Sequence, residues 1–278
     1  MNEQIKKEDQ LFEETSTETY ARFAQGVFNV VRVIHQELQT IAEKVAPHLE
    51  KAAPYLVALA QIDWAAVKQR LDELPKKSKD AMRLALAEGW FFGWHDGLQS
   101  LMELVESLEK TTQSSVDDIM VAYYRTNLQC FSDEITSEYP HRAAAIKAAV
   151  NAHMSLAEQG YFLSIPVFIA QADGLLAEIT GVESPMTKAA KVFSEKYADD
   201  PKSLDLLFPF LELQGSDFMM SAKARQDATQ ASGKSFTALN RHQVMHGERS
   251  DYGTEINSLK AFSFLVFAGL HIPAVLKR

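Results

Sequence analysis

Apolar side chains recur at steps of three and four residues along most of this chain, beginning with Phe23, Val27, Val30 and Ile34. This spacing places them on one face of an α-helix, because a helix completes a turn about every 3.6 residues. The pattern continues to Ile41 and predicts a long amphipathic helix in the first quarter of the chain.

The first strong interruption of the pattern is Leu74–Lys79, which contains a proline and three lysines. We expect a linker there. A new helix, capped by Ser78, should follow it and run towards Leu108.

Four aromatic residues occur within the five positions Trp90–Trp94. An exposed docking surface for a partner would explain them, and so would a thick core between helices, with Gly89, Gly93 and Gly97 allowing close approach. We favour the core. His95 is then interpreted as a core or surface histidine rather than as a ligand.

Polar residues, glycines and prolines divide the second half of the chain. Five polar residues at Thr111–Ser115 predict a boundary between two halves, with a new helix beginning directly after them. Pro140 suits the first turn of another helix, which Gly160 is expected to end. The apolar stretch Tyr161–Thr180 predicts a helix that stops at Gly181.

Shorter helices are predicted over 188–197 and 204–213, followed by a helix over 235–246 that stops at Gly247 and a long one over 254–275. Glycine and proline are sparse, with 12 and 9 residues among 278. The sequence therefore predicts an all-α protein in two parts, an N-terminal helical region over 1–112 and a C-terminal helical domain over 113–278.

A formal charge of −9 argues against a surface that coats nucleic acid throughout, because phosphate binding requires clustered cations. One local surplus of positive charge exists among the residues Lys223, Arg225, Lys234, Arg241 and Arg249. A phosphate site or a solvated surface would explain it about equally well.

Cys130 is the only cysteine, and the first residues, Met1–Gln4, lack the cationic start of a signal peptide. We therefore expect a protein of the reducing cytoplasm. The apolar stretch Ala261–Leu276 is shorter than a membrane span and contains a proline. It is interpreted as a buried terminal helix rather than a membrane anchor, and no membrane partner is expected.

Gln171 and Asp173 place polar groups inside the apolar helix predicted over 161–180. A buried carboxylate is costly unless a cation or hydrogen bonds accompany it. Asp173 should therefore face water, or one of these two residues should orient Arg241 from a facing helix.

The clearest chemical signal is the segment Asn240–His246. Arg241 and His246 lie roughly 140° apart around an ideal helix, so they converge only where a helix ends, as Gly247 suggests. Arginine supplies a permanent charge for phosphate, and histidine moves protons near neutral pH. Together they suit metal-free cleavage of RNA, in which the 2′-hydroxyl attacks the adjacent phosphate.

Arginine and histidine at this spacing, on the penultimate helix of an all-α domain, resemble the R-x4-6-H signature of the HEPN superfamily. The wider segment, Leu239–Gly247 followed by Asp251–Glu255 and Asn257–Lys260, is similar to bacterial HEPN-like proteins. The resemblance covers roughly residues 115–278. The preceding part of the chain resembles no family that we can name.

The resemblance implies a homodimer that cleaves RNA, such as tRNA, without a metal or cofactor and leaves a 2′,3′-cyclic phosphate. It implies a bacterial toxin or phage-defence effector, with an antitoxin or another defence protein as partner. Arg241 would bind the phosphate, His246 would transfer protons, and His242 and Asn240 would support them.

Three other interpretations stay open. His242 and His246 have the i, i+4 spacing of a zinc-binding helix, with Asp251 or Glu255 as a further ligand, although Gln243 stands where a zinc protease needs glutamate. The domain could instead be a non-catalytic HEPN-like module that binds a protein, a nucleotide or nucleic acid. Finally, these cations could simply stabilise the carboxyl end of a helix.

Overall fold

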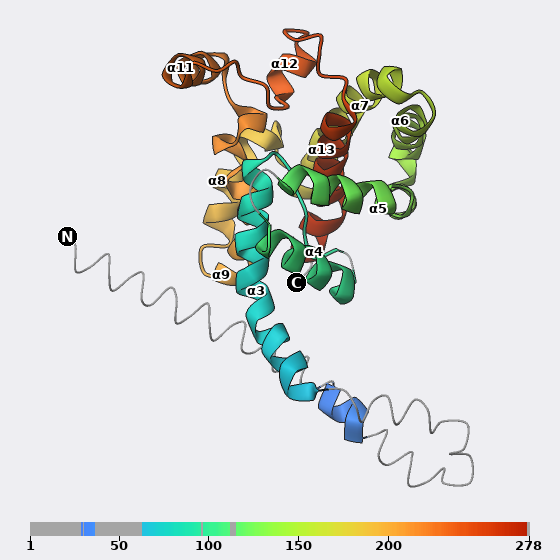
Figure 1. Cartoon of the computed structure of the whole chain (residues 1–278), viewed down its shortest axis with the longest axis vertical. Coiled ribbons are helices and arrows are strands. Elements are labelled where there is room, and N and C mark those ends of the chain that lie inside the picture. Colours follow the sequence, from blue (N-terminus) through green and yellow to red (C-terminus); the bar gives the residue numbers. More distant parts are fainter. Residues whose placement is uncertain (1–28, 30, 37–62, 96, 112–114, 277–278) are drawn as a thin grey trace, which may run out of the picture. The chain divides into compact units, whose positions relative to one another are not determined.

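The described part of the chain consists of helices and connecting segments, and no strand occurs in it (Figure 1). The computed structural model describes residues 29, 31–36, 63–95, 97–111 and 115–276. The predicted all-α fold is confirmed. Most of the amphipathic helix predicted over 23–41 lies outside the described residues, although residues 31–36 are helical.

The first long helices are α3 (Trp64–Ala87), α4 (Leu98–Glu109) and α5 (Val116–Glu138), and the short 3-10 turn η3 (Pro140–Arg142) leads into α6 (Ala143–Ser155) and α7 (Ala157–Thr180). The next elements are α8 (Pro185–Lys196), α9 (Pro201–Leu206), α10 (Phe208–Leu211), η4 (Leu213–Gly215), η5 (Asp217–Met219), α11 (Ala222–Ser232) and α12 (Arg241–Met245). The chain continues with α13 (Glu255–Val266), the π-helical turn η6 (Phe267–His271) and α14 (Ile272–Leu276).

The chain divides into two compact units, Met1–Lys77 and Ser78–Arg278. All the candidate site residues belong to the second unit. Residues 78–111 also belong to it, so this division does not coincide with the boundary predicted between 112 and 113.

The division between the two units, after Lys77, falls inside the linker predicted at Leu74–Lys79, but the segment is not a break in the helix, because α3 continues through all six positions. Ser78 does not begin a helix. It is buried, and its hydroxyl accepts a hydrogen bond from Trp94 Nε1 at 2.8 Å. A proline inside a helix costs about 3 kcal/mol. Burial of Ala81, Met82 and Ala85 on the face that follows favours continuation of the helix.

The helix predicted to run from Ser78 to Leu108 is broken between α3 and α4. Gly89 has a φ of +79°, a conformation that L side chains rarely adopt, and it ends the helical path. The residues that follow it, Trp90, Phe91 and Phe92, are each at most 1% exposed. The interpretation as core is therefore confirmed for these three residues, whereas Trp94 is half-buried.

The glycines near this cluster have different roles. A Cβ on Gly93 would lie 2.2 Å from the ring of His271, so the close approach predicted there is confirmed. Apart from its chain neighbours, no atom of the described residues lies within 4 Å of the Cβ position of Gly97, so it supports no such contact among them. Trp90 stacks on Tyr124 with ring centroids 5.9 Å apart, which joins the segment before α4 to α5.

Helices α6 and α7 form a tightly packed pair, and α13 packs against both α7 and α5 (Figure 1). The sequence predicted that Gly160 ends the helix before it. Gly160 instead lies within α7. A Cβ there would fall 1.8 Å from the carbonyl oxygen of Ala152 on α6, so only glycine permits this approach. Gly181 ends α7 with a φ of +66°, as predicted.

The long helix predicted over 254–275 is present as α13, η6 and α14 in succession. The Thr254 side chain caps its first turn, and nearly every residue from Leu259 to Val275 is buried. By length and composition alone, Ala157–Thr180 and Glu255–Leu276 could each cross a membrane, but 83% of the most apolar window of the second lies buried inside the structure. That burial is typical of a core helix, while the cytoplasmic location stays a prediction.

Candidate functional site

The segment with the arginine–histidine signature forms a helix of only five residues, α12 (Arg241–Met245), so the helix predicted over 235–246 is wrong. Asn240 is its N-cap, and the Asn240 side chain accepts a hydrogen bond from the backbone N–H of Gln243 at 3.2 Å. Gly247, with a φ of +67°, follows its last turn as predicted.

The preceding helix, α11 (Ala222–Ser232), was not predicted at all. Arg225 is its only buried residue, so α11 has no apolar face that could reveal it in the sequence. Gly233, with a φ of +66°, ends it and starts the irregular path that leads to Asn240.

Arg241 is held from the facing helix α7, as one of the two predicted arrangements required. Its Nη2 lies 3.2 Å from Oδ2 of Asp173. The arginine and aspartate side chains retain 23% and 29% of their exposure, so the ion pair lies at the edge of the protein. Arg241 Nε and Asp173 Oδ1 are buried and have no hydrogen-bond partner among the described residues.

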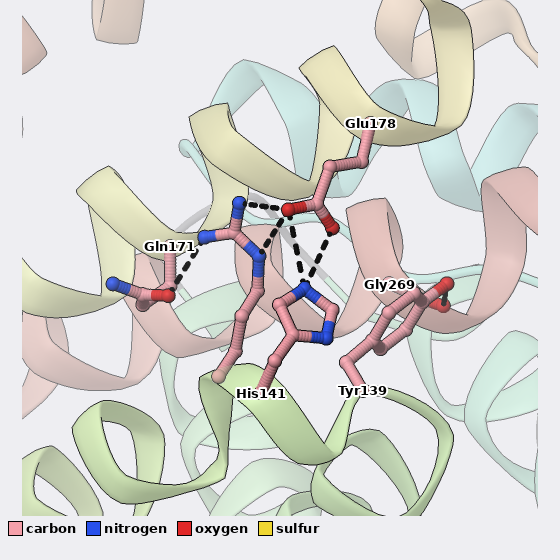
Figure 2. Close-up of polar contacts among 6 residues, drawn as sticks. Tyr139, His141, Gln171, Glu178 and Gly269 are labelled. Carbon is pink, nitrogen blue, oxygen red and sulfur yellow. Dashed lines mark hydrogen bonds and ion pairs between the residues drawn. The ribbon is translucent and has the colours of Figure 1, made fainter.

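Gln171 does not orient Arg241. Its side-chain oxygen accepts a hydrogen bond from Nη1 of Arg142 at 2.9 Å, as Figure 2 shows. Arg142 and His141 also bind Glu178 near the end of α7, at 2.6 and 3.1 Å. Gly174 leaves room for this arginine, because a Cβ there would lie 2.5 Å from Arg142 Nη1. This cluster joins the segment before α6 to α7. None of its residues contacts Arg241 in a hydrogen bond or ion pair among the described residues.

His242 and His246 stack on each other at the surface of α12. Their ring centroids lie 6.0 Å apart and the rings are nearly parallel, at 8°. The pKa of His242 is lowered, first by burial and then by the positive charges of Arg241, His246 and Arg225, with Glu248 opposing them. His242 is therefore neutral at neutral pH. His246 is exposed to solvent.

The zinc interpretation gains no third ligand among the described residues, where no group of three histidine, cysteine or acidic side chains is gathered. The two acidic residues proposed for it have other partners. Asp251 pairs with Arg249, and Glu255 pairs with Arg125 at 2.8 Å. The described residues therefore bring one guanidinium group and two imidazoles together on α12 and its C-cap.

Two further residues shape the site, Arg225, which the sequence singles out only as part of a local surplus of positive charge, and Glu248, to which it assigns no role. Arg225 is 6% exposed, and its Nη2 lies 2.5 Å from Oε2 of Glu248. No local signal reveals this pair, since the two residues belong to different segments and the exposed α11 shows no periodicity. Of the five cations in the predicted local surplus, Arg225, Arg241 and Arg249 are thus each paired with a carboxylate.

A cavity of about 640 Å³ lies near this region, between the end of α3, the carboxyl end of α11 and the start of α13. Arg241, His242 and His246 do not line it. Two cations on its wall have carboxylate partners, Lys260 with Asp117 at 2.9 Å and Arg249 with Asp251. This cavity is therefore not part of the candidate site.

Comparison of the chain with models of protein families, with characterised proteins and with solved structures found no match. The resemblance to the HEPN superfamily consequently remains a prediction based on the residues quoted above.

Proposed function

We propose that the protein is a metal-independent endoribonuclease of HEPN type, with Arg241, His242 and His246 at its site. The observation that carries this proposal is the arrangement on α12. An arginine anchored by Asp173 sits on the same short helix as a neutral imidazole, and an exposed imidazole stacks against the latter.

These groups match what cleavage of RNA by its own 2′-hydroxyl requires. Neutral His242 accepts the proton of the 2′-hydroxyl as that oxygen attacks the adjacent phosphorus. The bond from phosphorus to the 5′-oxygen breaks, and His246 in its protonated form gives that leaving oxygen a proton. The products are a 2′,3′-cyclic phosphate and a 5′-hydroxyl, so neither water nor an external oxidant takes part.

Arg241 stabilises the negative charge that develops on the phosphate. A guanidinium ion cannot lose its proton near neutral pH, and its planar fork matches two phosphate oxygens. The ion pair with Asp173 fixes the direction of the side chain before RNA arrives, which removes part of the entropic cost of orienting it. The same carboxylate weakens net attraction for phosphate, so binding relies on the wider RNA backbone as well.

The test is incubation of the purified full-length protein with total RNA and with tRNA, in excess chelator. His246→Ala and Arg241→Ala should each abolish cleavage, and the ends of the fragments should be 2′,3′-cyclic phosphates. His141→Ala is the matched control, because His141 is also an exposed histidine but binds Glu178 on the other cluster. Its activity should equal that of the wild type.

If the wild type binds RNA without cleaving it, the proposed ribonuclease activity is refuted, and the alternative, a non-catalytic HEPN-like module, is favoured. The homodimer, the toxin or phage-defence setting and the antitoxin partner follow only from the resemblance. Light scattering of the purified protein tests the dimer, and growth arrest on expression, abolished by His246→Ala, tests the toxin.

A further inference from the structure

Helix α12 is too short to hold its own shape. A five-residue helix makes little more than one turn, and isolated helices shorter than about 12 residues are marginal in water. The relative positions of Arg241, His242 and His246 must therefore be maintained by contacts from outside the helix.

One buried arginine contacts both ends of α12. Arg225 Nη1 donates to the Asn240 side-chain oxygen at 3.0 Å, and that oxygen is also the N-cap acceptor for Gln243. At the other end, Arg225 Nη2 binds Glu248, which directly follows the Gly247 turn. A single guanidinium group thus connects the residue before α12 to the residue after its terminating glycine.

Further hydrogen bonds support this arrangement. Arg225 Nη1 also donates to the carbonyl of Met220 at 2.8 Å, and the Asn240 amide donates to the carbonyls of Asp217 and Met220 at 2.7 and 3.0 Å. The backbone N–H of Glu248 donates to Gln243 O at 2.9 Å. A buried charge is expensive without such partners, and Arg225 has acceptors on three sides.

We propose that Arg225 is a positioning residue that holds both ends of α12 and so sets the geometry of the Arg241, His242 and His246 groups. Arg225 touches no reacting atom and acts through Asn240 and Glu248. As far as it concerns catalysis, this role rests on the proposed ribonuclease activity, whereas the positioning of the two imidazoles can be tested without it.

The decisive variant is Arg225→Lys, which keeps the positive charge but loses the planar fork that reaches Asn240 and Glu248 together. Arg125→Lys is the matched control, because Arg125 also pairs with a glutamate, Glu255, but lies on α5 away from these contacts. Glu248→Asp, at a half-exposed position, provides a second variant that keeps the negative charge but shortens the side chain that reaches Arg225 at the far end of α12.

The first readout is the NMR signals of the His242 and His246 rings, followed through a pH titration of the full-length protein. We expect both sets to shift in Arg225→Lys and in Glu248→Asp, and to keep their wild-type positions in Arg125→Lys. Wild-type ring signals and titration in both Arg225→Lys and Glu248→Asp would overturn the proposal. If Arg225→Lys does not fold, the Glu248→Asp spectrum decides in the same way, because this variant keeps the negative charge that acts on His242.

The second readout is RNA cleavage. We expect kcat to fall about 10- to 100-fold in Arg225→Lys while KM changes little, because misplacement of catalytic groups affects the transition state more than binding. If the wild type cleaves no RNA, the proposed function fails, and the ring signals still decide whether Arg225 positions the histidines. Unchanged kcat together with unchanged ring signals would remove Arg225 from this role.

Discussion

His95 makes the stability of this protein sensitive to mild acid. Its pKa is lowered from the usual value of 6.5 to about 3, mainly by burial and further by the charge of His271. Both ring nitrogens are buried and have no hydrogen-bond partner among the described residues. The ring packs edge-on against Phe131 with centroids 5.0 Å apart, so the site holds a neutral imidazole as if it were an apolar side chain.

The direction of the effect follows from the depressed pKa in the folded state. Between pH 6.5 and about 3, the unfolded chain binds a proton at His95 that the folded protein does not bind. The contribution of neutral His95 to the free energy of unfolding is therefore fully present above pH 6.5 and decreases as the pH falls below it. At pH 5 the loss is 1.5 pH units at about 1.4 kcal/mol each, or about 2 kcal/mol.

The assay is chemical unfolding of the wild type and His95→Leu at pH 7.5 and pH 5. At pH 7.5 the variant should be equally stable or more stable, because two unpaired polar atoms are replaced by an apolar group. Between the two pH values, the variant should lose about 2 kcal/mol less than the wild type. His153 also has a pKa lowered by burial, but both proteins contain it and its contribution cancels. Parallel losses in the two proteins would refute the reasoning.

Three further outcomes are expected. Gly160→Ala should destabilise the protein by about 3 kcal/mol or more in chemical unfolding, because the new Cβ would lie 1.8 Å from the carbonyl oxygen of Ala152, whereas Gly215→Ala, with no atom within 4 Å, should cost far less. Asp173→Asn should lower both KM for RNA and kcat, since Arg241 gains net charge but loses its anchor, and unchanged steady-state kinetics would contradict this. Chelator should leave cleavage unaffected, and activity restored by added zinc would instead support a metal site.

Several features of this fold could be predicted because a local signal determines them. Gly181 and Gly247 adopt the positive φ that ends a helix, and few other residues tolerate it. From Ala261 onwards the C-terminal helix is almost entirely apolar, which requires burial wherever it lies in the fold. The contact between Arg241 and Asp173 is one of the alternatives that the sequence left open, because a carboxylate in an apolar helix needs either water or a partner.

Other features depend on contacts between distant residues. The continuation of α3 through Leu74–Lys79 and the place of Gly160 inside α7 reflect packing that a local pattern cannot include. Similarly, the sequence offered both Asp173 and Gln171 as partners of Arg241. In the fold, the Gln171 side chain accepts a hydrogen bond from Arg142, at the start of α6, and Asp173 pairs with Arg241.

The sequence by itself determined the all-α class and the chemical groups at the candidate site, because helix periodicity and residue type are local properties. Only the tertiary structure decided that α12 is five residues long and that Arg225 connects Asn240 to Glu248 around it. A buried guanidinium ion draws its partners from whichever segments the fold brings within reach, and their separation along the chain gives no signal of the contact.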